Sequence, residues 1–175
     1  EGVRVAATGY GRVAVDYADF VITEITCHGR GGRELAGNEC AIIDVGGQDT
    51  KVILIDQGMI QDFLMNDKCS AGTGRFLEIM ANTLSMRPNE MCELAREGSG
   101  VTISSMCTVF AESEVINYIG EGKKREDIAA GVVDSVAAKV AQLSQRKTLS
   151  DKVILTGGLS DSVVVSASAA ISVKR

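Results

Sequence analysis

Residues 66–80 read Asn-Asp-Lys-Cys-Ser-Ala-Gly-Thr-Gly-Arg-Phe-Leu-Glu-Ile-Met. Cys69 stands in a polar turn, and a glycine-rich segment separates it from apolar residues that recur with helical spacing. This pattern predicts a helix that Ser70 or Thr73 can cap. We therefore expect Cys69 near the positive end of a helix dipole, where thiolates and other anions are stabilised.

A second stretch has the same plan. Residues 104–114 read Ser-Ser-Met-Cys-Thr-Val-Phe-Ala-Glu-Ser-Glu, so that Cys107 directly precedes a predicted helix with Thr108 as its cap. Two cysteines in two similar settings are the pattern from which the chemistry of this chain is inferred.

The composition is that of an acidic globular chain with an aliphatic core. Of 175 residues, 45% are hydrophobic and only 4% aromatic, and the net charge is -5. No Lys/Arg cluster exceeds residues 123–125, so nucleic acid is not an expected partner. The apolar runs are too short to span a membrane. Five cysteines without C-x-x-C pairing, and no visible export signal, favour a reducing cytoplasm.

The other three cysteines and the single histidine are expected to have structural roles. Cys40 and Cys92 are interpreted as small buried apolar residues, and a packing role is favoured for Cys27 as well. His28 is interpreted as a structural histidine with satisfied hydrogen bonds, in preference to a ligand or a base.

Hydrophobic periodicity predicts an α/β chain. Strands are expected at residues 40–45, 50–55, 59–65 and 152–155, with shorter ones at 3–8 and 101–103. Helices are expected at residues 23–35, 89–96, 108–119 and 126–145, besides the helix after Cys69. The first three long strands form a β-meander, whereas residues 159–175 carry only weak and mixed signals.

Two of these strands end in glycine turns. Residues 43–49 read Ile-Asp-Val-Gly-Gly-Gln-Asp, and residues 154–158 read Ile-Leu-Thr-Gly-Gly. Glycine permits the close approach that a phosphate or nucleoside needs, although a plain hairpin explains the first turn equally well. Neither turn is a Walker loop, because no G-x-x-x-x-G-K-[ST] occurs. Asp44 and Asp49 are expected to hold Mg²⁺ directly or through water, and Gln48 is the third catalytic candidate.

Five motifs in a fixed order carry a resemblance to a known family. They are Ala-Thr-Gly-Tyr-Gly-Arg at 7–12, the turn at 43–49, the two cysteine motifs at 66–76 and 104–115, and Leu-Thr-Gly-Gly at 155–158. Over residues 6–158 the chain resembles the activators of 2-hydroxyacyl-CoA dehydratases, in the BadF/BadG/BcrA/BcrD ATPase family. That family also contains the ATPase subunits of benzoyl-CoA reductase.

The resemblance implies an actin/Hsp70/sugar-kinase-like (ribonuclease H-like) ATPase fold and a homodimer with one [4Fe–4S] cluster between the subunits. Each subunit of the family gives two cysteines, which map to Cys69 and Cys107. This agrees with the residue pattern, because two cysteines per chain make a Cys₄ site only across a two-fold axis. ATP or ADP with Mg²⁺ is implied as the second cofactor. The expected nucleotide-binding residues are Gly46, Gly47, Gln48, Gly72, Gly74, Gly157 and Gly158.

The implied function is ATP-dependent donation of one electron to a partner. That partner is a 2-hydroxyacyl-CoA dehydratase or a benzoyl-CoA reductase-type component. Two alternatives stay open: a kinase or chaperone-like ATPase of the same fold without a cluster, and an interaction module in which zinc bridges two chains.

Two features depart from the family pattern. Nothing matches the D-x-G-S-type first phosphate loop of the family, and residues 167–173 match its last helix only faintly. We therefore expect three parts. Residues 1–38 are the remainder of a first lobe, residues 39–158 are a second lobe with both glycine turns and the two cysteines, and residues 159–175 are a C-terminal remnant.

Overall fold

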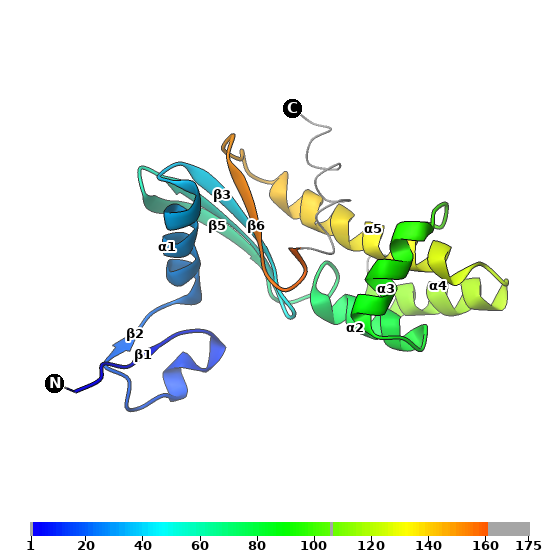
Figure 1. Ribbon diagram of the computed structural model, residues 1–175, viewed down its shortest axis with the longest axis horizontal. Coiled ribbons are helices and arrows are strands. Elements are labelled where there is room, and N and C mark those ends of the chain that lie inside the picture. The colour runs from blue at the N-terminus through cyan, green and yellow to red at the C-terminus, as the bar shows by residue number, and fades with distance from the viewer. Residues whose placement is uncertain (1, 106, 161–175) are drawn as a thin grey trace. The chain divides into compact units, whose positions relative to one another are not determined.

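The computed structural model describes residues 2–105 and 107–160 (Figure 1). The chain forms two compact units. Unit 1 contains the chain up to Ile42 with Ile53–Phe63 and Leu149–Ile154, and unit 2 contains Ile43–Val52, Leu64–Thr148 and the chain from Leu155 on. The lobes expected from the sequence stay a prediction, and residues 161–175 of the expected C-terminal remnant lie outside the described residues.

Unit 1 begins with two short parallel strands, β1 (Ala6–Ala7) and β2 (Phe20–Val21), with a 3₁₀ helix at Tyr10–Ala14 between them. The strand expected at residues 3–8 is therefore present only in part. Before Ala6 a side chain takes the place of a strand partner, because the N–H of Val5 donates to the carboxylate of Asp19 at 2.8 Å.

Helix α1 (Glu24–Ala36) is capped by Thr23, whose hydroxyl accepts from the N–H of Thr26. Its glycines argued against a helix, yet Gly29 and Gly32 are both buried. A β-carbon on Gly32 would lie 2.2 Å from Cδ1 of Ile42, so glycine lets the helix pack closely on strand β3. The helix forms because this close packing outweighs the low helix propensity of glycine.

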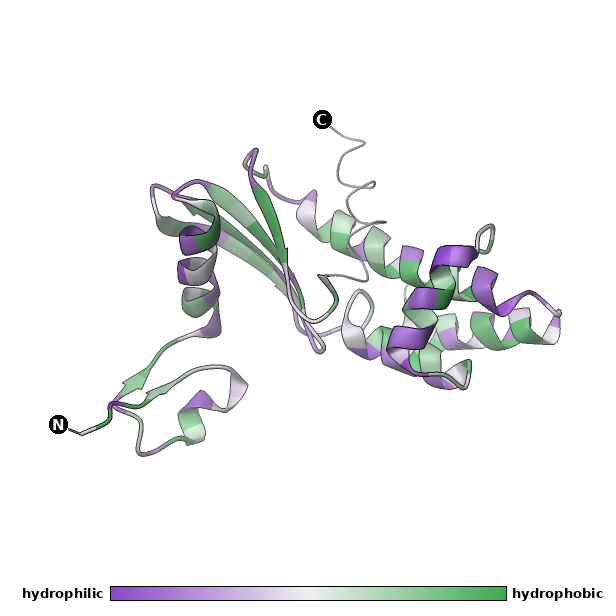
Figure 2. Ribbon diagram, in the orientation of Figure 1, coloured by the Kyte–Doolittle hydropathy of each residue, from purple (hydrophilic) through white to green (hydrophobic). Residues whose placement is uncertain are grey.

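A four-stranded sheet has the order β5-β4-β3-β6. Its strands are β3 (Cys40–Val45), β4 (Thr50–Asp56), β5 (Met59–Asn66) and β6 (Val153–Thr156), which confirms the four long strands expected from the sequence. Every residue of β3 is buried, as expected of a strand flanked on both sides, and its ribbon is mostly hydrophobic in Figure 2. Between β4 and β5, Gln57 and Gly58 both have positive φ, which matches the twist that a tight hairpin requires.

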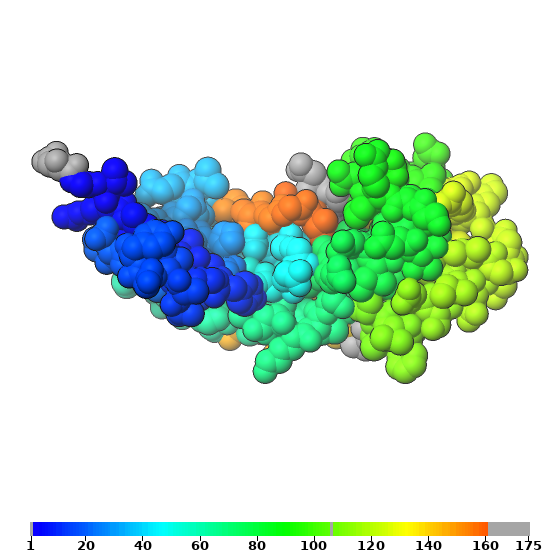
Figure 3. All heavy atoms as spheres, turned by 90° about the horizontal axis from the view of Figure 1, so that it is seen from below, coloured from blue at the N-terminus to red at the C-terminus, as the bar shows by residue number. Residues whose placement is uncertain are grey.

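Four helices of unit 2 pack together: α2 (Gly74–Thr83), α3 (Pro88–Leu94), α4 (Thr108–Gly120) and α5 (Arg125–Ser144). A 3₁₀ turn at Ala95–Glu97 continues α3. Apolar residues with helical spacing form one stripe on α5, which is buried at Ile128, Val132, Val136 and Val140 and half-buried at Leu143. In the space-filling view the green to yellow atoms of these helices form one continuous body (Figure 3).

The short strand expected at residues 101–103 is wrong, since these residues form no strand. Helices, and not neighbouring strands, supply the hydrogen bonds and the packing of residues 101–103. The hydroxyl of Tyr118 donates to the carbonyl of Thr102 at 3.0 Å, and Ile103 is buried. A β-carbon on Gly131 would lie 2.7 Å from the carbonyl oxygen of Val101, so α5 approaches this segment through a glycine. Helix contacts thus replace strand pairing here.

Over the described ranges of the chain, no helix combines the length and the apolar character needed to cross a membrane.

Candidate functional site

The first glycine turn lies against the start of α2. The N–H of Gly74 donates to the carbonyl of Gly46 at 2.9 Å, and the N–H of Arg75 donates to the carbonyl of Gly47 at 2.8 Å. A β-carbon on Gly74 would lie 3.0 Å from Cα of Gly47, so the approach is close enough to favour glycine. The structure brings these three glycines together, and their binding of a nucleotide stays a prediction.

Gly72 connects the same turn to strand β4. Its φ is +87°, and its carbonyl accepts a 2.6 Å hydrogen bond from the hydroxyl of Thr50, the first residue of β4. A β-carbon on Gly72 would lie 2.9 Å from Cβ of Lys139 on α5. Gly72 is therefore held between the sheet and α5 in a conformation that suits only glycine.

The second glycine turn follows β6 in the chain and lies against Val45, the last residue of β3. Gly157 has φ +95°, and a β-carbon on it would lie 2.3 Å from the carbonyl oxygen of Val45. The N–H of Leu159 donates to that same carbonyl at 3.3 Å. Gly158, in contrast, has no atom within 4 Å of the position of a β-carbon. Gly157 is thus required by packing, whereas Gly158 faces open space.

A buried charged cluster lies between the two glycine turns. The ammonium of Lys51 is 3.2 Å from Oδ2 of Asp44 and 2.5 Å from Oδ1 of Asp49. The exposed fractions of Asp44, Asp49 and Lys51 are 3%, 4% and 2%. Thr156 donates from its hydroxyl to Oδ1 of Asp44 at 2.8 Å. Such burial of charge is tolerated because the opposite charges are paired and hydrogen-bonded.

This cluster changes the interpretation of the catalytic candidates. Asp44 and Asp49 were expected to face a divalent cation, and the structure places the ammonium of Lys51 against both of them. Gln48 lies exposed on the turn. Over residues 2–105 and 107–160, no group of three or more His, Cys, Asp or Glu side chains is arranged to hold a metal ion. The assignment of Asp44, Gln48 and Asp49 to Mg²⁺ and catalysis stays a prediction.

Cys69 is an exposed free cysteine on the turn between β5 and α2. Helix α2 begins at Gly74 with Thr73 as its N-cap residue, so Cys69 stands four residues before the cap. The hydroxyl of Thr73 donates to the carbonyl of Ser70 at 2.6 Å and makes no capping bond. Thr73 is thus the N-cap residue, one of the two expected, but its hydroxyl bonds within the turn and not to the helix.

Cys107 is also an exposed free cysteine, and it is itself the N-cap residue of α4. Thr108, which was expected to be the cap, is the first residue of the helix. The side chain of Cys107 makes no capping hydrogen bond, while its carbonyl accepts the helical bond from Ala111 at 2.9 Å. Its sulfur is thus near the positive end of α4 without being used by the cap.

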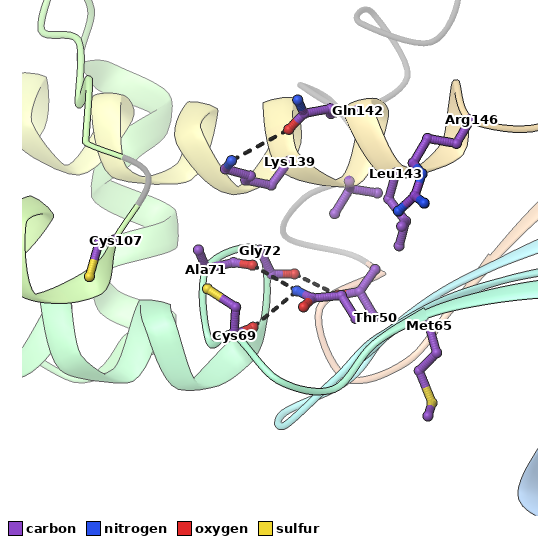
Figure 4. A pocket seen from close by; sticks show the side chains of 12 residues that line it. Thr50, Met65, Cys69, Ala71, Gly72, Cys107, Lys139, Gln142, Leu143 and Arg146 are labelled. Carbon is purple, nitrogen blue, oxygen red and sulfur yellow. Dashed lines mark hydrogen bonds between the residues drawn. The ribbon is translucent and has the colours of Figure 1, made fainter.

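A hydrogen bond joins the two cysteine-bearing turns. The hydroxyl oxygens of Ser70 and Thr108, the residues that directly follow the two cysteines, are 2.7 Å apart. Cys69 and Cys107 line one pocket of about 650 Å³ in unit 2, together with Gly72 and Lys139 (Figure 4). Two exposed thiols in one pocket are soft donors that suit an iron–sulfur cluster or zinc.

The other cysteines have different surroundings. Cys40 and Cys92 are buried, as expected, and burial raises the pKa of the Cys40 thiol against the opposing effect of Lys152. Cys27 is exposed, and its thiol donates to the hydroxyl of Thr8 at 3.5 Å. A buried packing role for Cys27 is therefore wrong, because it lies off the face of α1 that packs on the sheet.

Three polar residues at the site were missed in the sequence. Lys51 lies in the strand expected at residues 50–55, where its buried pairing with Asp44 and Asp49 was not foreseen. Asn66 donates from its side-chain amide to the carbonyls of Cys69 and Ala71, at 3.0 and 3.1 Å. Glu114 accepts from the N–H and hydroxyl of Ser104 and from the hydroxyl of Ser105. The contacts of Asn66 and Glu114 depend on how each turn folds, and the residue types alone do not reveal them.

Comparison with known proteins supports the motif resemblance. The (R)-2-hydroxyglutaryl-CoA dehydratase activating ATPase of Acidaminococcus fermentans is 46% identical over 155 residues, which cover 87% of this chain and 60% of that protein. The activator of lactoyl-CoA dehydratase of Anaerotignum propionicum is 50% identical over 155 residues, with the same coverage of 87% and 60%. The chain thus spans about 60% of the length of these curated relatives.

A solved structure agrees with the sequence matches. The activator of the 2-hydroxyisocaproyl-CoA dehydratase from Clostridium difficile, with bound ADPNP, superposes with a TM-score of 0.90 at 43% identity, covering 97% of this chain and 65% of that chain. The actin/Hsp70-like ATPase fold expected from the resemblance is therefore confirmed. The sequence model of the BadF/BadG/BcrA/BcrD ATPase family matches residues 1–173. The chain belongs to the BadF/BadG/BcrA/BcrD ATPase family.

Proposed function

We propose that this chain is part of an ATP-dependent activator that passes one electron to an acyl-CoA dehydratase or a related acyl-CoA reductase. Its relatives are activators of acyl-CoA dehydratases. The observation that carries the proposal is the 2.7 Å hydrogen bond between Ser70 and Thr108, since it unites the two cysteine-bearing turns.

The residues that would hold a [4Fe–4S] cluster are Cys69 and Cys107, with the same pair from a second copy of the chain. Two thiolates per chain are half of a Cys₄ set, so a two-fold axis completes it. The exposed apolar side chains of α4 support contact with a second copy beside Cys107. They are Val109, Phe110, Ile116 and Ile119. When bound, the cluster supplies a one-electron reductant.

Helix α4 would offset negative charge at this site. Cys107 is the N-cap of a helix of 13 residues, and the first N–H groups of a helix have no partner within it. Their partial positive charge would offset negative charge on a group held at Cys107. Lys139, on the wall of the same pocket, adds a cation whose stem packs over Gly72.

The nucleotide is proposed to bind between Gly46, Gly47 and Gln48 on one side and Gly157 and Gly158 on the other. The ADPNP bound by the Clostridium difficile activator supports a nucleotide site in this fold. Gln48 is exposed on its turn and so is free to meet a phosphate or its Mg²⁺. Asp44 and Asp49, held in place by Lys51, are proposed to orient that ion through water.

Backbone contacts supply a route between the two parts of the site. A movement of the Gly46 turn displaces the carbonyls that accept from Gly74 and Arg75 at the start of α2. The N–H and hydroxyl of Thr73 both donate to the carbonyl of Ser70, which reaches Thr108 through its own hydroxyl. Nucleotide binding at the Gly46 turn can therefore change the relative positions of the two cysteine-bearing turns.

The experiment uses the full-length protein, purified without oxygen, with iron measured in single variants. Cys69→Ser and Cys107→Ser are expected to lose most of the bound iron while remaining folded, since each removes a ligand. Cys27→Ser is the matched control, because it removes an exposed thiol outside the pocket. Full iron in both test variants would overturn the proposal. Zinc in place of iron would favour the zinc-bridged module, and ATP hydrolysis without metal would favour a cluster-free ATPase.

A further inference from the structure

Each cysteine-bearing turn is held by one polar side chain from outside the turn. At Cys69 the side-chain amide of Asn66 donates to two carbonyls, that of Cys69 at 3.0 Å and that of Ala71 at 3.1 Å. Asn66 is the last residue of β5, so it fixes the turn to the end of a paired strand. A single NH₂ group thereby closes the loop on both sides of Ser70.

At Cys107 the corresponding residue is Glu114, two turns further along α4. Its Oε2 accepts from the N–H of Ser104 at 2.8 Å, and its Oε1 accepts from the hydroxyls of Ser104 and Ser105 at 2.5 and 2.6 Å. Burial, the largest single effect, raises the pKa of Glu114, but the hydrogen bonds from the two serines together outweigh it and lower the pKa. The carboxylate is therefore the form that binds this segment.

The two arrangements use opposite chemistry. Asn66 acts as a donor to backbone carbonyls, whereas Glu114 acts only as an acceptor. Glu114 lies outside the pocket that contains the two thiols, whereas Asn66 is part of the pocket wall with its amide turned to the backbone of the Cys69 turn. Each is hydrogen-bonded to the backbone or the leading residues of its turn, so each can fix where a thiol is presented.

We propose that Asn66 and Glu114 are positioning residues, Asn66 for Cys69 and Glu114 for Cys107. Both roles rest on the proposed function, because the same two thiols would hold the cluster. Removing the Asn66 amide frees the turn around Cys69, and removing the Glu114 carboxylate frees the segment that leads to Cys107. The two effects are separable because the two side chains contact different turns.

The test is the alkylation rate of each cysteine in the full-length, metal-free protein, measured with iodoacetamide and mass spectrometry of tryptic peptides. Every cysteine falls in its own peptide, for example residues 69–75 for Cys69 and 97–123 for Cys107. Asn66→Ala is expected to raise the rate at Cys69, and Glu114→Ala the rate at Cys107. An increase on the order of tenfold is expected for the loss of a charge-assisted hydrogen bond, and a smaller one for Asn66.

Isosteric variants and a matched control make the result specific. Asn66→Asp and Glu114→Gln keep the side-chain shape but reverse part of the hydrogen-bonding pattern, so they should reproduce the effects if alanine prevents folding. Glu112→Gln is the control on α4, since Glu112 accepts from Thr83 at 3.2 Å and not from the Cys107 segment. It should change neither rate.

The outcomes separate this inference from the cluster proposal, because alkylation needs no iron. Selective acceleration, Cys69 with Asn66 and Cys107 with Glu114, supports the positioning roles even if the protein never binds iron. Equal acceleration of all cysteines, including buried Cys40 and Cys92, would mean general destabilisation and overturn them. Unchanged rates in all four test variants would overturn them as well.

Discussion

Ser70 and Thr108 are 38 positions apart in the sequence, and their hydroxyl oxygens lie 2.7 Å from each other. Each residue directly follows one of the two cysteines that line a common pocket. This contact makes the two cysteine-bearing turns one structural feature, although each belongs to a different part of the chain.

The Ser70–Thr108 contact can be removed with little change of volume. Ser70→Ala and Thr108→Val are each expected to lower the free energy of unfolding by about 1 kcal/mol, the typical contribution of one hydrogen bond. The double variant should cost less than the sum of the two, because both remove the same interaction. Urea unfolding of the full-length protein measures this. Ser113→Ala is the control, since Ser113 is exposed on α4 and bonds only within its helix. Strictly additive losses would contradict the contact.

The two glycines of the second turn should respond differently to substitution. Gly157→Val is expected to destabilise the fold, because a β-carbon there meets the Val45 carbonyl at 2.3 Å and φ is +95°. Gly158→Val should leave the fold intact, since its β-carbon meets no atom within 4 Å. It is expected to weaken ATP binding by steric exclusion. Thermal unfolding and calorimetric ATP titration separate the two effects, and unchanged ATP affinity in Gly158→Val would contradict the nucleotide site.

Lys51 is expected to be essential for stability. Lys51→Met leaves the carboxylates of Asp44 and Asp49 buried without the ammonium that pairs them, which should cost about 3–5 kcal/mol. Adding Asp49→Asn should restore part of this loss, because it removes one of two like charges. Lys124→Met, at an exposed position, should change stability by less than about 0.5 kcal/mol. A Lys51→Met variant as stable as the parent would contradict the role of the cluster.

The contribution of Glu114 should depend on pH in a defined direction. The hydrogen bonds from Ser104 and Ser105, opposed by burial, lower its pKa below the ordinary value of 4.5. A depressed pKa in the folded state means stability that is fully present above pH 4.5 and lost as the pH falls through the folded value. The stability difference between the parent and Glu114→Gln should therefore shrink between pH 6 and about pH 3. A difference that does not vary with pH would argue against the ionised contact.

The sequence is most informative where one segment determines its own structure. The apolar run Cys40–Val45 is a buried strand, and the periodic segment expected at residues 126–145 is helix α5 (Arg125–Ser144). The glycines of α1 argued against a helix in the sequence. In the folded chain they allow the helix to approach the sheet closely, which the sequence alone does not show. The residues 101–103 look like a strand but have no neighbouring strand to pair with, so helices contact them instead.

The candidate site was predictable in its parts more than in their arrangement. The two cysteines and the glycine turns are marked by local patterns, whereas the cap of α4 falls one residue earlier than expected, at Cys107. Lys51, Asn66 and Glu114 act through partners that folding brings to them, so their types alone did not reveal their roles. A polar side chain gains its function here from the atoms that it meets in the folded chain.

The central claim is that Cys69 and Cys107 of two chains together hold one [4Fe–4S] cluster. The most direct measurement is the iron and acid-labile sulfide content of the full-length protein, purified without oxygen and combined with its native mass. We predict a two-chain assembly with about two irons and two sulfides per chain, that is, one cluster per pair. An iron-free protein, a zinc-containing protein, or a full cluster on a single chain would contradict it.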